Sequence, residues 1–325
     1  MATYKGIQGF TIQNLSADPS NPIEGQVWYN STSNVWKVEE TTAAGAWATG
    51  GNLGTARYGL AGAGTQTEGL AFGGYTTVAV NNTEEYNGSS WTAGGSLGTA
   101  RYALAGAGTQ TAGLAATGGV PPTTSTEEYN GTSWMAGGNV GAVRYLLAGA
   151  GTQTAGLIFG GLTPSPVIST TATEEYDGSS WTAGGALPSQ KYAHGGAGIQ
   201  TAALAFGGDD PGPILNTTEE YNGSTWTAGG TMNTARRRLA GAGTQTAALG
   251  FGGDAPPTVS GATEEYDGAS WTTSPGSMNT ARYLLAGAGT QASALAFGGL
   301  TPSLTGATEE WTGPGALVTK TITVS

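Results

Sequence analysis

Two stretches decide the fold of this chain: residues 57–74, RYGLAGAGTQTEGLAFGG, and residues 83–91, TEEYNGSSW. Both return along the chain with a period of about 45 residues. The basic residue that opens the first stretch stands at Arg57, Arg101, Arg144, Lys191, Arg236 and Arg282, so the unit occurs six times. A fixed period of this length marks a repeat architecture, in which each copy is one supersecondary unit that shares a core with its neighbours.

One copy reads as four short strands. Residues 57–64 alternate with period two and carry small residues that suit a crowded centre. After the turn at 65–68, an apolar run ends in Gly73-Gly74, where glycine permits positive φ and a sharp exit. TEEY and SSW form the third and fourth strands, joined at Asn87-Gly88, a strong signal for a two-residue hairpin. The pattern predicts an all-β protein, a six-bladed β-propeller.

The ends of the repeat region indicate how the ring closes. Trp47 precedes the first inner strand as other Trp residues precede the later ones, whereas the last copy stops at TEEWTG without a following Trp. We expect the strand of Trp47 to complete the last blade, which leaves no exposed edge. Glu-Glu pairs occur seven times, so we expect the chain to begin partway through a blade. The predicted organisation is an N-terminal hairpin and attachment segment over residues 1–35, the propeller over 36–311 and a tail over 312–325.

Charge is placed once per copy. Fourteen of the 22 acidic residues lie in the Glu-Glu pairs, and six of the eleven basic residues stand at the Arg57 position. We expect one Glu of each pair to meet the basic residue of its own or of the neighbouring copy. Acid-base catalysis by a pair is the alternative, but neighbouring residues of a strand point to opposite faces. His194, at the place of Leu60, and the repeated Trp and Tyr are predicted to be core residues rather than catalytic or sugar-stacking groups.

The composition excludes several classes of function. A net charge of −11 argues against nucleic acid and against anionic membrane surfaces. With no Cys and a single His, the chain offers no thiol nucleophile, disulfide or multi-His metal centre. An apolar run of about 18 residues and a secretory signal are both missing. We therefore expect a protein that is not an enzyme, with no catalytic residues, no metal site, no cofactor and no membrane insertion.

The link from Gly-Gly to TEEY is the part that varies in length and composition from copy to copy, over residues 75–82, 120–125, 162–172, 209–217, 254–262 and 300–307. Because consecutive strands run antiparallel, these links emerge on one face, where loops on a rigid scaffold commonly bind ligands. Neutral drift of exposed loops is the alternative. The candidate ligand-binding residues are Tyr75, Pro121, Thr123, the run Thr163-Pro164-Ser165-Pro166, Asp209, Asp210, Asp254, Pro256, Pro302, Arg237 and Arg238.

Two of these groups carry charge. Asp209 and Asp210 are adjacent carboxylates that suit a cation or sugar hydroxyls, and Arg237 and Arg238 break their repeat at positions held elsewhere by Tyr and mostly by a small or apolar residue. The two arginines are either solvated or an anion site. The overall negative charge favours a neutral or cation-bridged glycan over a phosphate-rich one.

The repeat resembles that of kelch-type β-propellers: a basic residue before the inner strand, an apolar run ending in Gly-Gly, and then a Tyr and a Trp at fixed offsets. This resemblance covers roughly residues 36–311 and implies the fold, not the chemistry. Residues 22–38, PIEGQVWYNSTSNVWKV, resemble short modules in tail-fibre and other virion structural proteins of bacteriophages, especially marine ones. The chain as a whole is similar to kelch-like proteins of such phages.

These resemblances imply a non-enzymatic virion structural protein, a tail fibre, appendage or decoration made in the host cytoplasm and carried on the extracellular particle. Its expected partners are other virion proteins, through residues 1–35, and a host surface glycan or protein; homo-oligomerisation stays open. A polysaccharide-degrading propeller enzyme is the alternative of another class, and a kelch-type protein interaction module is a third. Unrepeated His, Tyr, Arg and carboxylates clustered in one or two copies would favour the enzyme.

Overall fold

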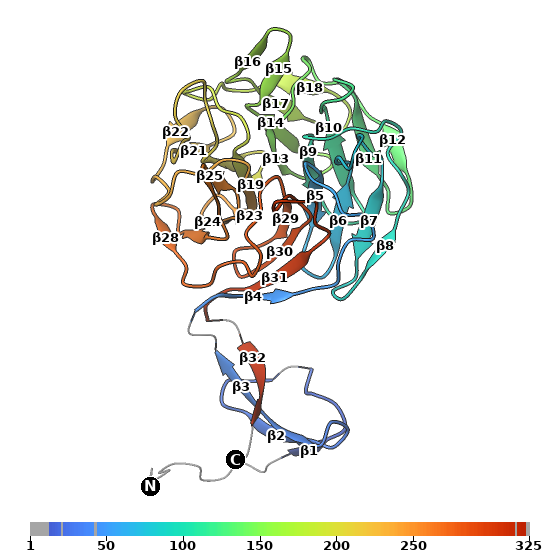
Figure 1. The fold of residues 1–325 in the computed structure, drawn as a ribbon, viewed down its shortest axis with the longest axis vertical. Helices are drawn as coiled ribbons and strands as arrows, with labels where there is room; N and C mark the ends of the chain where they lie inside the picture. The colour runs from blue at the N-terminus through green and yellow to red at the C-terminus, as the bar shows by residue number, and fades with distance from the viewer. Residues whose placement is uncertain (1–12, 21, 42–43, 316, 323–325) are drawn as a thin grey trace. The chain divides into compact units, whose positions relative to one another are not determined.

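A computed structural model describes residues 13–20, 22–41, 44–315 and 317–322. The chain divides into two compact units: Ala46–Thr312, which holds the repeats, and a smaller one formed by Met1–Gly45 with Gly313–Ser325. Throughout the described residues the regular elements are β-strands, and no helix occurs (Figure 1). The predicted all-β class is therefore confirmed.

Each repeat forms a four-stranded antiparallel sheet. In the first, β5 (Ala61–Gly64), β6 (Gly69–Phe72), β7 (Thr83–Tyr86) and β8 (Trp91–Ala93) pair in chain order. The next four sheets are β9 (Ala105–Gly108), β10 (Gly113–Ala116), β11 (Thr126–Tyr129), β12 (Trp134–Ala136); β13 (Ala148–Gly151), β14 (Gly156–Phe159), β17 (Thr173–Tyr176), β18 (Trp181–Ala183); β19 (Gly195–Ile199), β20 (Ala202–Phe206), β21 (Thr218–Tyr221), β22 (Trp226–Ala228); and β23 (Ala240–Thr244), β24 (Ala247–Phe251), β27 (Thr263–Tyr266), β28 (Trp271–Thr273). Such repeated sheets are consistent with a propeller.

The sixth repeat sheet joins the two ends of this unit. It consists of β29 (Ala286–Gly289), β30 (Ser293–Phe297), β31 (Thr308–Thr312) and β4 (Ala46–Thr49). Trp47 of β4 lies opposite Trp311 of β31 in an antiparallel register. The predicted pairing of the Trp47 strand with the last copy is therefore confirmed.

The first strands of the sheets contact one another in sequence: β5 with β9, β9 with β13, β13 with β19, β19 with β23, β23 with β29, and β29 with β5. They lie near the middle of the unit in Figure 1, and the fourth strands lie at its periphery. The approach is so close that a Cβ added to Gly106 would come within 2.8 Å of the carbonyl oxygen of Gly62 on the neighbouring strand. Glycine at this position of each copy follows from that crowding.

Backbone hydrogen bonds also run from sheet to sheet just before the inner strands. The amide of Gly59 donates to Leu284 O at 2.8 Å, and the amide of Ala103 donates to Gly59 O at 2.6 Å. The series continues through Leu146, Ala193 and Arg238 and returns to Leu284, so the six bonds form a closed cycle, which we call the axial ring. Its residues are all left-handed, with φ from 52° to 58°. Such a conformation is strained for the non-glycine members, and the cycle holds them in it.

Aromatic side chains pack between neighbouring sheets. The Trp226 ring lies 4.9 Å from that of Phe159 in the preceding sheet, and its Nε1 donates to Thr173 Oγ1 at 3.0 Å. Equivalent contacts join Trp91 to Phe297 and Trp134 to Phe72. The predicted packing between copies is thus confirmed. Trp47, Trp226 and Trp271 are buried, whereas Trp91, Trp134 and Trp181 are partly exposed at the outer strand.

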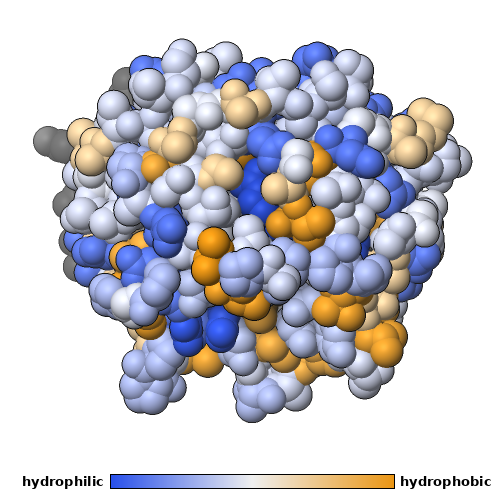
Figure 2. Space-filling model, turned by 90° about the horizontal axis from the view of Figure 1, so that it is seen from above, coloured by the Kyte–Doolittle hydropathy of each residue, from blue (hydrophilic) through white to orange (hydrophobic). Residues whose placement is uncertain are grey.

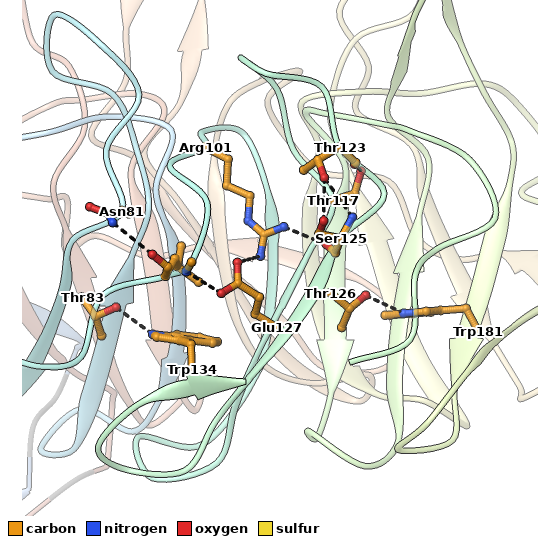
Figure 3. Close-up of polar contacts among 12 residues, drawn as sticks. Asn81, Thr83, Arg101, Thr117, Thr123, Ser125, Thr126, Glu127, Trp134 and Trp181 are labelled. Carbon is orange, nitrogen blue, oxygen red and sulfur yellow. Dashed lines mark hydrogen bonds and ion pairs between the residues drawn. The ribbon is translucent and has the colours of Figure 1, made fainter. Parts of the chain in front are cut away.

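A buried ion pair lies inside each repeat sheet. Arg101 Nη2 contacts Glu127 Oε1 at 2.9 Å, Arg101 Nη1 donates to Ser125 O at 2.7 Å, and the amide of Gly98 donates to Glu127 Oε2 at 2.6 Å (Figure 3). The corresponding pairs are Arg57–Glu84, Arg144–Glu174, Lys191–Glu219, Arg236–Glu264 and Arg282–Glu309. The expected pairing of one Glu per copy with the basic residue is confirmed.

The second Glu points the other way, toward the next sheet. Tyr129 donates its hydroxyl hydrogen to Glu85 Oε1 at 2.5 Å, and burial together with this bond raises the pKa of Tyr129 to about 12. Equivalent hydrogen bonds, each to the second Glu of the preceding sheet, are donated by the hydroxyls of Tyr86, Tyr176, Tyr221 and Tyr266. The two carboxylates of a pair are therefore separated by the strand and hold different structural partners.

The smaller unit is a separate sheet. It pairs β1 (Gln13–Leu15), β2 (Val27–Asn30), β3 (Val35–Thr41) and β32 (Leu317–Ile322) in that order. The β2–β3 hairpin was predicted, but β3 continues past residue 35 and pairs with β32. The predicted limits therefore differ from the observed ones: residues 36–45 lie outside the repeat unit, and the 312–325 tail supplies a strand to the same sheet as β3. The Glu39-Glu40 pair consequently belongs to this sheet and not to a repeat sheet. Residues 1–12 lie outside the described residues.

Candidate ligand-binding face

The six variable links leave the repeat unit at the same end of their sheets. Each follows the second strand and precedes the antiparallel third strand, as between β6 and β7. We call the surface made by residues 75–82, 120–125, 162–172, 209–217, 254–262 and 300–307 the link face. The chain enters this unit at Ala46 and leaves it at Thr312, which are paired at the opposite end of the sixth sheet.

The opposite end is held by invariant structural contacts. Gln110, in the turn between β9 and β10, donates through Nε2 to Gly69 O at 3.1 Å and to Tyr86 O at 2.7 Å in the preceding sheet. The glutamines at 66, 153, 200, 245 and 291 bond the preceding sheet in the same way. The near-identity of these turns follows from their role in joining sheets. The links meet the following copy through backbone groups near their ends, as where the Leu97 amide donates to Asn81 O at 2.9 Å, a contact that does not depend on the side chain.

The start of each link is anchored rigidly. The residue after the buried basic residue forms a β-bridge with the start of the link, as between Tyr58 and Tyr75, whose backbones exchange bonds of 3.1 and 2.8 Å. Two links go on to form hairpins: β15 (Leu162–Pro164) with β16 (Val167–Ser169), and β25 (Asp254–Ala255) with β26 (Thr258–Val259).

The tips of the links expose apolar side chains. Nine large apolar side chains are exposed among the described residues, and five of them belong to links: Val78, Val120, Val167, Ile168 and Val259. Within the repeat unit, Met135 of β12 and Ile199 at the end of β19 are exposed away from the links. Val78 and Val167 are the most exposed of these, at 62% and 63%. Figure 2, which views the molecule from above relative to Figure 1, shows apolar residues spread among weakly polar ones, without a single large apolar area on that side.

In five of the six copies the residue just before the axial-ring residue is a tyrosine. Tyr58, Tyr75 and Tyr102 form a half-buried cluster with ring centroids 5.3 to 6.3 Å apart. Tyr145, Tyr192 and Tyr283 hold the position of Tyr58 in three other copies. The sequence singled out only Tyr75; the signal for the others was their fixed place after the buried basic residue.

A cavity of about 80 Å³ lies where the inner strands begin. Its wall consists of the axial-ring residues and the residue that follows each of them, which is Leu in five copies and His194 in one. Arg238 is the other polar side chain of the wall. We call this hollow the axial cavity.

His194 is buried, as the sequence predicted, with 6% of its surface exposed. Neither ring nitrogen has a hydrogen-bond partner among the described residues. Burial, with Lys191 and Arg144 nearby, holds the pKa of His194 well below its ordinary value. The imidazole is therefore neutral near pH 7 and offers one donor and one acceptor.

A charged cluster stands beside this cavity. Arg237 contacts Asp209 Oδ2 through Nη1 and lies 3.3 Å from Asp254 Oδ2 through Nε, so it bridges carboxylates from two neighbouring copies. Arg238 Nη1 lies 3.7 Å from Asp254 Oδ2, and its guanidinium stands 5.5 Å from the Tyr283 ring centre. Asp254 Oδ1 is buried without a partner in the described chain. Arg237 is thus neither simply solvated nor a free anion site.

The remaining predicted residues are separated from this cluster. Asp210 caps a turn, accepting the amide of Gly212 at 2.6 Å, while Asp209 beside it faces Arg237; the two do not form one site. Thr123 contacts Ser125 Oγ at 2.8 Å (Figure 3). Pro121, Ser165, Pro166, Pro256 and Pro302 are exposed on the links, and Thr163 and Pro164 are partly buried.

Within the described residues, no three acidic or histidine side chains gather where they could hold a metal ion. No helix long and apolar enough to cross a membrane is found in that part of the chain. Comparison with models of known protein families gave no match, and comparison with curated proteins gave none either.

Proposed function

We propose that the repeat unit is a closed six-bladed propeller of the kelch type, with β4 completing the blade of β29–β31. Two cyclic sets of contacts support this count: the axial ring of hydrogen bonds and the sequence of inner-strand contacts that returns from β29 to β5. Closure removes the exposed edges of the first and last copies, which is how such folds avoid edge-to-edge association.

We further propose that the protein is a non-enzymatic structural component of a bacteriophage particle and presents the link face to the host surface. The observation that carries this proposal is the division of the repeat: the turns at one end are fixed by glutamine contacts, and variation and exposed apolar groups gather at the other. The chain enters and leaves at the fixed end, so the links are free to meet a partner. The resemblance of residues 22–38 to phage virion modules gives the context.

A binding role rather than a catalytic one is favoured by the state of the carboxylates. Glu84 and its equivalents are paired with buried cations. Tyrosine hydroxyls donate to five of the second Glu residues, Glu85, Glu128, Glu175, Glu220 and Glu310. Glu265 differs, because the next sheet has Trp311 in place of the tyrosine, and burial raises the pKa of its carboxyl. On the link face, Arg237 contacts both Asp209 and Asp254, and Arg238 also approaches Asp254, so two guanidinium groups face two carboxylates. A glycoside-cleaving dyad needs one carboxyl group free to donate a proton and another free to attack or activate water.

Mass spectrometry and antibody labelling of purified virions test the context. We expect the protein to be present in stoichiometric amount on the particle, and a variant lacking residues 1–35 to be absent from it. If purified particles lack the full-length protein, the virion proposal is wrong.

A further inference from the structure

One position of the repeat differs in chemistry in a single copy. It is His194 in the fourth copy and, in the others, Leu60, Leu104, Leu147, Leu239 and Leu285. All six side chains are buried. His194 is the only histidine of the chain, which has no Cys, so no other side chain has an ordinary pKa between about pH 5 and 8. The fourth copy therefore carries a group that can gain a charge where the others carry an apolar side chain.

The imidazole lies between the third and fourth repeat sheets. A Cβ added to Gly160, which follows β14 of the third sheet, would come within 2.5 Å of His194 Cε1. The ring of Phe159 in β14 lies 5.5 Å from the imidazole and 4.9 Å from the ring of Trp226, the tryptophan that joins the same two sheets. We call the contact of His194, Phe159 and Trp226 the third–fourth joint. Because Phe159 contacts both other rings, a change at the imidazole also reaches the tryptophan contact.

This joint does not compensate a proton on the imidazole. Each ring nitrogen of His194 has less than 1 Å² of accessible surface, and neither has a hydrogen-bond partner among the described residues. Water is therefore kept from both nitrogens, and that part of the chain offers no acceptor for the second N–H that protonation creates. A buried charge without a partner is strongly unfavourable.

The charged groups around the imidazole add to this cost. Arg144 of the third copy donates to Gly160 O at 2.9 Å, and Lys191 precedes His194 in the fourth copy; both cations oppose a charge on the ring. Arg238 of the fifth copy lines the axial cavity together with His194. The carboxylates beside these three cations already contact them: Glu174, Glu219 and Asp254.

We propose that the third–fourth joint is an acid-sensitive contact: the neutral His194 holds the third and fourth sheets together, and its protonation loosens this contact before the others. The other five junctions have Leu in the same position and do not respond. The joint has this property whether or not the link face binds a host, because it depends only on how the two sheets pack.

The direction of the pH effect follows from where the proton binds more readily. Burial and the two nearby cations hold the pKa of His194 in the folded protein well below its ordinary value of 6.5, so the unfolded chain binds the proton more readily. The stability that the neutral ring provides is therefore fully present above about pH 6.5 and is lost as the pH falls below it. Once the unfolded chain is protonated, the unfolding constant rises about tenfold for each further pH unit.

Urea unfolding of the full chain at a series of pH values tests the joint. His194→Leu is the matched variant, because it restores the residue of the other copies. The ratio of the unfolding constants of parent and variant should rise about tenfold from about pH 7.5 to pH 5.5. Glu265, whose carboxyl pKa is raised by burial, is present in both proteins, so its effect cancels in the ratio. If His194→Leu does not fold, His194→Gln, which cannot titrate in this range, takes its place.

Two further measurements separate the joint from general acid lability. The single histidine gives one Cε1–H NMR signal, whose shift should not titrate near pH 6.5 while the protein is folded. Hydrogen exchange at about pH 5.5 should be faster in the parent than in His194→Leu for the peptides of β13, β14, β19 and β20, and equal in both for those of β5 and β6.

The proposal is overturned if the ratio of unfolding constants does not change with pH, or if the histidine signal of the folded protein titrates near its ordinary pKa. Exchange that is faster by the same amount in all six repeat sheets would also contradict it, because the effect would then not belong to this joint.

Discussion

Replacing Arg101 by methionine is expected to destabilise the repeat unit by about 3–5 kcal/mol, the usual cost of leaving one partner of a buried ion pair without the other. Arg101 is fully buried, and its guanidinium donates to Glu127 at 2.9 Å and to Ser125 O at 2.7 Å. Methionine fills much of the volume but provides neither charge nor donor. Glu127 would keep the 2.6 Å bond from the Gly98 amide, which compensates only part of its lost hydration.

The chain provides the matched control for this change. Lys191 stands at the equivalent position of the fourth copy, where its Nζ contacts Glu219 and lies 3.1 Å from Thr217 Oγ1. Arg101→Lys should therefore keep the ion pair and cost only about 1–2 kcal/mol for lost hydrogen bonds. Urea unfolding followed by tryptophan fluorescence measures both variants, with equal m-values as the check that the same unit unfolds. A loss below about 1 kcal/mol for Arg101→Met, or equal losses for both variants, would refute the reasoning.

Three further changes test the packing between copies. Because burial and the bond to Glu85 raise the pKa of Tyr129 to about 12, its stabilising effect is present below about pH 10 and lost as the pH rises to 12; the melting temperature should fall across that range, and less so in Tyr129→Phe. Gly106→Ala should cost roughly 1–3 kcal/mol in urea, because its Cβ would meet Gly62 O at 2.8 Å, whereas Gly119→Ala, with only ordinary contacts from 3.4 Å, should cost clearly less. Trp226→Ala should cost about 3–5 kcal/mol by the same assay, and a loss under about 1 kcal/mol would show that the ring does not join sheets.

The repeat made most of the fold predictable. A fixed order of basic residue, Gly-Gly, TEEY and Asn-Gly or Asp-Gly sets strand, turn and ion pair in each copy, and the unmatched Trp47 and TEEW ends identified the pairing of β4 with β31. The smaller unit was less visible, since β32 belongs to no repeat and its partner β3 is far away in sequence. The prediction that the chain begins partway through a blade was based on Glu39-Glu40, which has the sequence of the repeated Glu-Glu pairs but lies in the sheet of the smaller unit.

The candidate site was predictable in position but not in composition. The variation of the links predicted the face, and Asp209, Asp254, Arg237 and Arg238 were among the candidate residues, the two arginines as departures from the repeat. That Arg237 would bridge two aspartates from different copies depends on how close neighbouring sheets lie, which no pattern within one copy encodes. The axial cavity depends on the left-handed backbone of six residues with unlike side chains, so it too had no sequence signal.

The most direct test of the central claim, that the link face attaches the particle to its host, is adsorption of the labelled protein to the bacterium on which the virions grow. One variant has the links at 162–172 and 254–262 replaced by the 120–125 sequence, and a second has the turn at 65–68 replaced by the equivalent turn of another copy. We predict that the parent and the turn variant adsorb equally and that the link variant loses adsorption while remaining folded. Adsorption retained by the folded link variant, or absent in the parent, would contradict the account.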